Sequence, residues 1–192
     1  GTLWLQPLCN AMNEHAAPGA AAPTRPTWRF AGAHPAHAIA FGFGAGLGRI
    51  APGTAGTLWA WATFLLLDRA LGDTGWAIFL GISMALGWWA ATLTSQHLQV
   101  TDSSHIVCDE VVAFWLILWL LSPAPFWEQL AAFGLFRLFD AAKWGPVRWA
   151  DTHFKGLGWR GGLGIMLDDL VAAGLTLLVL AWLRVSDLAP WW

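Results

Sequence analysis

The sequence predicts an all-α helical bundle of about five to seven helices that is embedded in a membrane or attached to one. It is 57% hydrophobic and only 11% charged, whereas a typical soluble domain has roughly 25% charged residues. Sixteen tryptophans and no tyrosine favour the membrane–water interface, where one end of the indole ring is wet and the other dry. No stretch alternates polar and apolar residues as a half-buried strand does. We therefore expect helices throughout, with the polar groups gathered at one end of the bundle.

Length, charge and cysteine content narrow the classes of function. A chain of 192 residues is expected to form one domain with a sizeable core. A net charge of −2 without a basic block gives no reason to expect a nucleic-acid partner. Two cysteines, Cys9 and Cys108, make neither a disulfide framework nor a Cys-x-x-Cys metal site. The oligomeric state cannot be predicted from these features.

The chain is expected to begin with a leader and a glycine-rich segment. Residues 1–35 are rich in Ala and Pro and predict a disordered leader, followed by a single domain over residues 36–192. Residues 41–57 are rich in glycine and lead into a helix expected to begin at about Leu58. The segment has part of the spacing of a nucleotide phosphate loop but lacks its lysine, which argues against nucleoside triphosphates. It is either a flexible re-entrant turn or a cradle in which Arg49, Gly53 and Thr54 bind an anion near a helix N-terminus.

Two apolar helices are expected before residue 102. The first covers Leu58–Leu67 and ends at a polar turn over Asp68–Asp73. The second has its core at Trp76–Leu93, inside a stretch from Thr74 to Thr101 without a single Asp, Glu, Lys or Arg. About 20 apolar residues cross the hydrocarbon of a bilayer, so this second helix is long enough to span it.

Three further helices are expected after residue 110. Val111–Trp127 is free of charge but broken at Ser122–Pro125, and Phe126–Asp140 forms the next helix. The last apolar helix covers about residues 163–184. Because an even number of passes separates the polar motifs, we expect all of them at one end of the bundle. Basic residues gather at that end, which predicts a cytoplasmic location for it.

Acidic residues at the heads of apolar helices are the most informative feature of the sequence. Asp102, Asp109 and Glu110 precede one apolar run, and Asp168 and Asp169 precede another. Charging such groups is costly unless a partner compensates them. A bound divalent cation would do so, and ligands that are all oxygen indicate Mg²⁺ rather than Zn²⁺.

Two structural explanations compete with a metal site. The carboxylates, with Asp140 at the end of the preceding helix, could pair with Arg137, Lys143 and Arg148. Asp102 could instead cap a helix N-terminus. If the metal is present, carboxylates, Mg²⁺, basic side chains and a glycine loop together suit a phosphate ester.

The spacing of cysteine, arginine and aspartate disfavours two other phosphatase mechanisms. Neither cysteine is followed six residues later by Arg, and no Asp-x-Asp pair exists, which disfavours cysteinyl-phosphate and haloacid-type mechanisms. A small membrane cation transporter or channel is the alternative function, because intramembrane carboxylates also mark cation pathways. Clustering at one end argues against it. A membrane scaffold with structural ion pairs is the third class.

The motifs resemble the bacterial phosphatidylglycerophosphatase A family over about Ala40 to Ala173. The matching residues are Phe43-Gly44-x-Gly46-Leu47 with Ile50-Ala51-Pro52-Gly53-Thr54-x-Gly56-Thr57-Leu58, Asp102 with Ile106-Val107-x-Asp109-Glu110, Phe136-Arg137-x-x-Asp140-x-x-Lys143 with Pro146-Val147-Arg148, and Gly162-x-Gly164-Ile165-Met166-x-Asp168-Asp169. The resemblance implies an all-helical, Mg²⁺-dependent enzyme of the bacterial inner membrane that hydrolyses phosphatidylglycerophosphate, an anionic phospholipid, to phosphatidylglycerol and phosphate. The chain departs from the family pattern at Cys108, where Trp is common, and at Ser103-Ser104-His105.

The predicted site residues fall into three sets. The predicted catalytic residues are Asp109, Glu110, Asp168 and Asp169. The predicted Mg²⁺ ligands are Asp102, Asp109, Glu110, Asp140, Asp168 and Asp169. The residues predicted to bind the substrate phosphate are Arg49, Gly53, Thr54, Arg137, Lys143 and Arg148.

Overall fold

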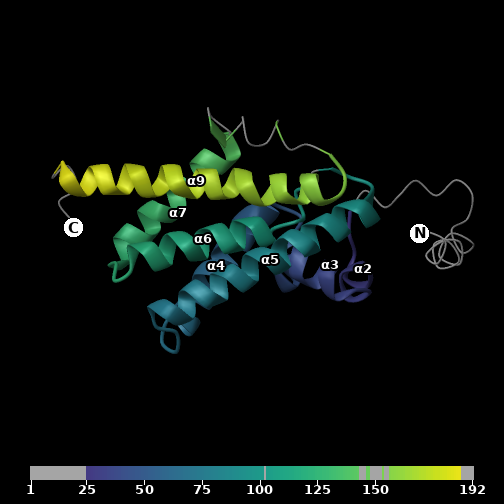
Figure 1. Cartoon of the computed structure of the whole chain (residues 1–192), viewed down its shortest axis with the longest axis horizontal. Coiled ribbons are helices and arrows are strands. Elements are labelled where there is room, and N and C mark those ends of the chain that lie inside the picture. Colours follow the sequence, from purple (N-terminus) through teal and green to yellow (C-terminus); the bar gives the residue numbers. More distant parts are fainter. Residues whose placement is uncertain (1–24, 102, 143–145, 148–152, 154–155, 187–192) are drawn as a thin grey trace, which may run out of the picture.

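The structure is a computed structural model that describes residues 25–101, 103–142, 146–147, 153 and 156–186. Within those ranges every regular element is a helix and no strand is present, which confirms the predicted all-α class. The elements are α2 (Trp28–Gly32), α3 (Pro35–Ala40), the 3₁₀ helix η1 (Gly42–Leu47), α4 (Pro52–Leu67), α5 (Asp73–Leu98), α6 (Cys108–Leu121), α7 (Phe126–Ala142) and α9 (Trp159–Val185) (Figure 1).

Helix α6 lies at the centre of the bundle and packs against α4, α5, α7 and α9. Its side chains Phe114, Ile117 and Leu118 are fully buried. A helix that is apolar all round is typical of a core or a membrane, and most of the uninterrupted apolar run after Glu110 is buried here, although Leu120 near its end is exposed. Phe136 of α7 stacks on Phe114 with ring centroids 5.8 Å apart, which ties α7 to this centre.

Within the described part of the chain, two helices are long and apolar enough to cross a membrane, namely α5 and α9. They contain 26 and 27 residues, and at 1.5 Å per residue each is about 40 Å long, more than the ~30 Å hydrocarbon core. Helices α4, α6 and α7 contain only 16, 14 and 17 residues. The two apolar helices indicate membrane association.

Three helix starts differ from those expected from the sequence. Helix α4 begins at Pro52 rather than at about Leu58, because the fixed φ of proline suits the first helical turn. Helix α9 begins at Trp159, ahead of the expected residue 163. The predicted disordered leader over residues 1–35 already contains α2 at Trp28–Gly32, and residues 1–24 lie outside the described part of the chain.

The short N-terminal helices pack against α5 through histidines. In α3, His37 is buried and stacks on Phe30 of α2 with ring centroids 4.2 Å apart. His37 Nε2 lies 2.9 Å from Nδ1 of His97, which is in the last turn of α5. These contacts hold α2 and α3 at the end of the bundle where α5 ends and α9 begins (Figure 1).

Candidate active site

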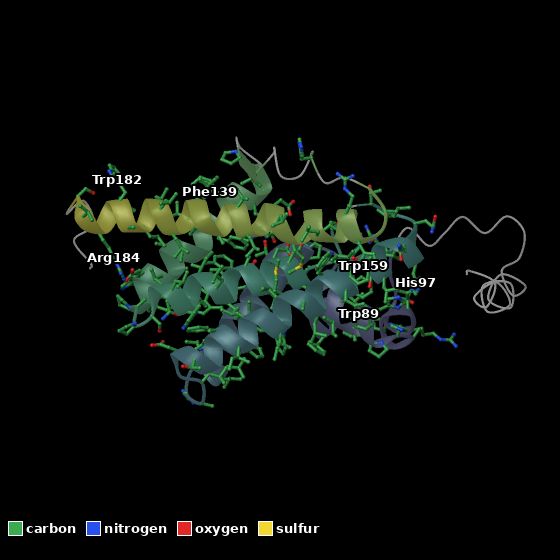
Figure 2. All side chains as sticks on the ribbon, viewed as in Figure 1. Trp89, His97, Phe139, Trp159, Trp182 and Arg184 are labelled. Atoms are coloured by element: carbon green, nitrogen blue, oxygen red, sulfur yellow. The ribbon has the colours of Figure 1, made fainter. Side chains whose placement is uncertain are left out.

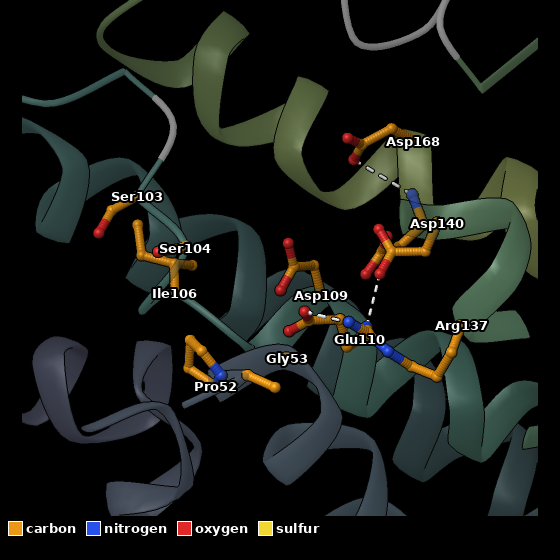
Figure 3. A pocket seen from close by; sticks show the side chains of 12 residues that line it. Pro52, Gly53, Ser103, Ser104, Ile106, Asp109, Glu110, Arg137, Asp140 and Asp168 are labelled. Atoms are coloured by element: carbon orange, nitrogen blue, oxygen red, sulfur yellow. Dashed lines mark hydrogen bonds and ion pairs between the residues drawn. The ribbon is translucent and has the colours of Figure 1, made fainter. Parts of the chain in front are cut away.

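A cavity of about 310 Å³ opens where the N-termini of α4 and α6 meet the C-terminal part of α7 and the first half of α9 (Figure 3). The bundle therefore brings the polar motifs together at one place, as the even number of helical passes predicts. The residues that line the cavity are Ala51, Pro52, Gly53, Ser103, Ser104, Ile106, Asp109, Glu110, Arg137, Asp140, Asp168 and Asp169.

Three carboxylates converge in this cavity. Asp109, Glu110 and Asp169 each offer one oxygen, and these oxygens lie within 4.8 Å of one another. Asp109 Oδ1, Glu110 Oε2 and Asp169 Oδ2 are inaccessible to solvent and have no hydrogen-bond partner. Because an unsatisfied buried oxygen of an ionised group is costly, this set of atoms can accommodate a cation.

A helix N-terminus can stabilise the negative charge of two of the three carboxylates, but not that of the third. Asp109 and Glu110 lie in the first turn of α6, where free backbone N–H groups and the helix dipole stabilise negative charge. Asp169 lies well inside α9, ten residues after Trp159, and gains nothing from a helix end. Its buried position next to the other two therefore needs a different compensation.

Arg137 is the only lysine or arginine among the described residues that line the cavity. Its Nη1 donates to Glu110 Oε1 at 3.4 Å and to Asp140 Oδ2 at 2.5 Å (Figure 3). Asp140 is one turn away on the same helix, so it fixes the direction of the guanidinium. Among the described residues that line the cavity, this one cation accompanies five carboxyl groups.

Burial and mutual repulsion act on the carboxyl groups of α6. Burial raises the pKa of Asp109 well above its ordinary value, and the neighbouring charges of Glu110 and Asp168 raise it further. Burial likewise raises the pKa of Glu110, aided by Asp169 and Asp140, while Arg137 opposes the shift. A bound cation would reverse both effects, because it favours the ionised form.

The backbone of α4 approaches the carboxylates closely. Pro52 and Gly53 line the cavity at the start of this 16-residue helix, and the first N–H groups of a helix have no partner within it. Thr57 Oγ1 donates to Gly53 O at 2.9 Å and anchors the first turn. The position suits contact between a bound anion and the helix N-terminus.

Seven of the predicted site residues line one cavity. They are Gly53, Asp109, Glu110, Arg137, Asp140, Asp168 and Asp169. Thr54 follows Gly53 on α4 but does not line the cavity, and Arg49 is exposed and lies outside its lining. Asp102, Lys143 and Arg148 lie outside the described residues.

The structure adds lining residues that were not among the predicted site residues. Ser103, Ser104 and Ile106 belong to the segment that leads into α6, and their closeness in sequence to Asp109 was the available signal. His105 Nδ1 lies 2.7 Å from Gly46 O and holds this segment against η1. Cys108 is buried and directed toward α5, with Sγ 3.7 Å from Gly87 O, and it does not line the cavity.

Comparison with known proteins agrees with the resemblance noted in the motifs. The family model described as Phosphatidylglycerophosphatase A matches residues 38–184. A protein of Escherichia coli named phosphatidylglycerophosphatase A is 36% identical over 143 residues, which cover 72% of this chain and 77% of that protein. A protein of the same name from Haemophilus influenzae is 38% identical over 141 residues, covering 73% and 83%.

A third relative has a different name. A protein of Bacteroides thetaiotaomicron, named as a candidate phosphatidylinositol-3-phosphatase, is 36% identical over 150 residues, which cover 74% of this chain and 89% of that protein. No solved structure matches the chain. The match of the family model over most of the sequence, together with these identities, shows that the chain belongs to the phosphatidylglycerophosphatase A family.

Proposed function

We propose that this protein is a Mg²⁺-dependent lipid phosphatase that hydrolyses the phosphomonoester of phosphatidylglycerophosphate to phosphatidylglycerol and phosphate. The observation that supports it best is the convergence of the Asp109, Glu110 and Asp169 carboxylates beside the guanidinium of Arg137. Each offers one oxygen within 4.8 Å of those of the other two, and each has a buried oxygen without a hydrogen-bond partner. Membership of the phosphatidylglycerophosphatase A family supports the same substrate.

The donor atoms fit magnesium. All three are carboxylate oxygens, which Mg²⁺ prefers, whereas Zn²⁺ prefers nitrogen and sulfur ligands. Asp109, Glu110 and Asp169 would hold the ion, with Asp140 and Asp168 close by. When bound, Mg²⁺ would polarise the phosphoryl oxygens and lower the pKa of water.

The protein's own groups would bind and orient the phosphate. Arg137 has planar N–H donors that match two phosphoryl oxygens at once, and Asp140 holds that guanidinium in place. The N-terminus of α4 at Gly53 would receive a further phosphoryl oxygen. Five other residues predicted to bind metal or phosphate stay predictions from the sequence, namely Asp102, Lys143, Arg148, Thr54 and Arg49.

We propose direct attack by water as the simplest chemical course. The water oxygen forms a bond to phosphorus, the bond between phosphorus and the glycerol oxygen breaks, and the released alkoxide takes up a proton. A carboxylate of the trio accepts the proton that the attacking water loses. Arg137 balances the charge of the equatorial oxygens during this displacement.

We also propose that the site faces the cytoplasm at the inner membrane. In the sequence pattern, the end of the bundle with the polar motifs carries more arginines than the opposite end. The first group is Arg25, Arg29, Arg49 and Arg160, and the second is Arg69 and Arg184. An excess of basic residues favours the cytoplasmic side. The substrate is then an anionic phospholipid of that leaflet.

A cation channel or transporter is the rival function. A pathway through the membrane needs polar groups along its whole depth, but α6 carries no charged residue after Glu110 as far as its end at Leu121. The carboxylates are gathered in one cavity instead. This arrangement favours chemistry at one end of the bundle.

The test is phosphate release in detergent from phosphatidylglycerophosphate, with phosphatidylinositol 3-phosphate as the competing substrate. We expect Mg²⁺-dependent release that EDTA abolishes, with the higher kcat/KM on phosphatidylglycerophosphate. Preference for the inositol lipid would replace the proposed substrate while keeping the chemistry. Release that is unaffected by EDTA would contradict the metal mechanism, and no release from either lipid would contradict phosphatase function.

A further inference from the structure

A second cavity, of about 210 Å³, lies on the other side of α6 and is almost wholly apolar. Helices α5 and α6 provide most of its wall, and Trp59 of α4 and the η1 region complete it. Residues Cys108, Val111, Val112 and Trp115 occupy one face of α6, since they are spaced at i, i+3, i+4 and i+7. The wall contains one hydroxyl residue, Ser83, and no charged residue.

The cavity is elongated along the helices. It follows α5 from Phe79 to Gly87 and α6 from Cys108 to Trp115, which is about 10–12 Å at 1.5 Å per residue. Phe79 and Trp115 contact each other at one end, with ring centroids 5.0 Å apart. The lining is therefore an apolar slot along two helices, with an aromatic pair at one end.

The far side of the slot is sealed and its rim is exposed. Trp115 Nε1 donates to Ala60 O at 2.9 Å, which fastens α6 to α4 beside the aromatic end. At the rim, the side chains of Phe43, Trp59 and Leu86 are exposed by 69%, 40% and 45%. Because α5 is one of the two candidate membrane-spanning helices, a slot along it that opens through apolar side chains is accessible to lipid.

The opposite end of the slot lies next to the carboxylate cavity. Cys108 lines the slot and the next residue, Asp109, lines the carboxylate cavity. Val107 precedes Cys108 at the N-cap of α6 and is packed tightly, because a β-carbon at Gly42 or Gly56 would lie 3.0 Å or 2.8 Å from Val107 side-chain carbons. The two cavities therefore lie on opposite faces of the first turn of α6 and are separated by the width of that helix.

We propose that this apolar slot, lined by Ser83, Val112 and Trp115 among others, receives one fatty acyl chain of the lipid whose phosphate is bound by the carboxylate cavity. The inference rests on the proposed function and adds to it the part of the protein that recognises the acyl chain of the lipid. A lipid whose terminal phosphate is joined to diacylglycerol through a phosphoglycerol unit bridges one helix width, about 10 Å. Because the acyl chain moves from an apolar membrane or micelle into an apolar slot, it gains little hydrophobic free energy. The slot therefore aligns the substrate rather than adding affinity.

Filling the slot tests this proposal. Ser83 is half-buried in the wall, so Ser83→Leu places an extra side chain where the acyl chain would lie. Ala85 is exposed on the same helix and outside the slot, so Ala85→Leu is the matched control. Each variant is assayed with long-chain phosphatidylglycerophosphate and with its deacylated, water-soluble analogue.

We expect Ser83→Leu to lower kcat/KM on the long-chain lipid at least about tenfold, because the phosphate is then misaligned. Turnover of the deacylated analogue stays unchanged, and Ala85→Leu changes neither. An equal loss on both substrates, or no loss on the long-chain lipid, would overturn the proposal.

A labelling experiment separates failure of the slot from failure of the proposed function. A phosphatidylglycerophosphate and a diacylglycerol that carry the same photoreactive acyl chain are each crosslinked to the protein. We expect the phosphatidylglycerophosphate to label residues 79–87 and 108–115 more strongly than the diacylglycerol does, and Ser83→Leu to remove that excess. Equal labelling by both would show that bulk lipid fills the slot, and would overturn the proposal whether or not the protein turns over any substrate.

Discussion

Gly53 at the start of α4 faces Glu110 at the start of α6 so closely that a β-carbon at residue 53 would overlap Glu110 Oε1. The same β-carbon would lie 2.9 Å from Arg137 Nη2 and 3.0 Å from Nη1. Three helices therefore meet at a point where only a glycine fits. The absence of a side chain at this residue allows the carboxylate and the guanidinium to reach the backbone of α4.

Gly53→Ala is predicted to lower turnover by about 10²-fold, because the new methyl group displaces Glu110 and Arg137 from their positions. Gly134→Ala on α7 is the control, since a β-carbon there would meet nothing within 4 Å. Both changes put alanine inside a helix, where it is favoured over glycine. Phosphate release measured on both variants checks the prediction, and equal activity of the two would contradict the close contact.

Arg137→Lys is predicted to lose most of the activity although the charge is kept. A lysine is a point charge and cannot give two parallel hydrogen bonds to phosphoryl oxygens. In the parent, Nη1 alone contacts both Glu110 and Asp140, which leaves the other guanidinium N–H groups for phosphate. We expect kcat/KM to fall by about 10²-fold. The exposed Arg69 serves as the control, and Arg69→Lys should leave the activity at the parent level.

The ion pair between Glu128 and Arg184 is predicted to stabilise the bundle without affecting turnover. Glu128 is 1% exposed and contacts Arg184 near the C-terminal end of α9 (Figure 2). Arg184 follows Asp169 on this helix by 15 residues, which is about 22 Å at 1.5 Å per residue. Arg184→Ala leaves the buried carboxylate without this cation, which is destabilising, though less so than in a fully buried pair because 43% of the Arg184 side chain is exposed.

Thermal unfolding in detergent measures how much stability is lost when the ion pair is broken. We expect Arg184→Ala to lower the Tm, and a second change, Glu128→Gln, to restore part of the loss because it removes the charge. Should the double variant be less stable than Arg184→Ala alone, the proposed cost of the unpaired carboxylate would be refuted. Phosphate release by the folded single variant should equal that of the parent.

His37 is predicted to make stability depend on pH. Burial lowers the pKa of His37 below its ordinary value, the Phe30 carbonyl opposes this, and His97 and His34 add to it. His37 Nδ1 lies 2.9 Å from Phe30 O, which requires the proton on Nδ1 and leaves Nε2 to accept from His97. Protonation of Nε2 would break that contact.

The direction of the pH effect follows from proton binding. Because the pKa of His37 is lower in the folded state, the unfolded chain binds more protons below about pH 6.5, and stability falls as the pH drops. We expect the Tm of the parent to fall between about pH 7.5 and pH 5 by more than the Tm of His37→Asn. Identical pH profiles would exclude this contribution of His37.

The sequence predicted those parts of the site that lie close together along the chain. Asp109 with Glu110, and Asp168 with Asp169, stand out because each pair precedes an apolar run. Their convergence followed from the number of helices between them. The contact between Gly53 and Glu110 joins residues 57 positions apart and depends on the depth at which α4 packs on α6. Such a distance cannot be read from periodicity.

The elements near the N-terminus were harder to predict for a similar reason. Residues 28–40 contain five alanines and one proline and have no apolar period, so they gave no helical signal. They become ordered through tertiary contacts, of which the pairing of His37 with His97, sixty residues away, is the clearest. The start of α4 at Pro52 had a local signal in the proline itself, which the surrounding glycines obscured.

Binding of Mg²⁺ by the carboxylate trio is the central claim, and calorimetric titration of Mg²⁺ into the detergent-solubilised protein tests it most directly. Asp109→Asn and Asp169→Asn are compared with Asp73→Asn, which changes an exposed carboxylate at the start of α5. We predict saturable binding to the parent and to Asp73→Asn, and none to either of the other two variants. Unchanged Mg²⁺ binding in Asp109→Asn and Asp169→Asn would contradict the account.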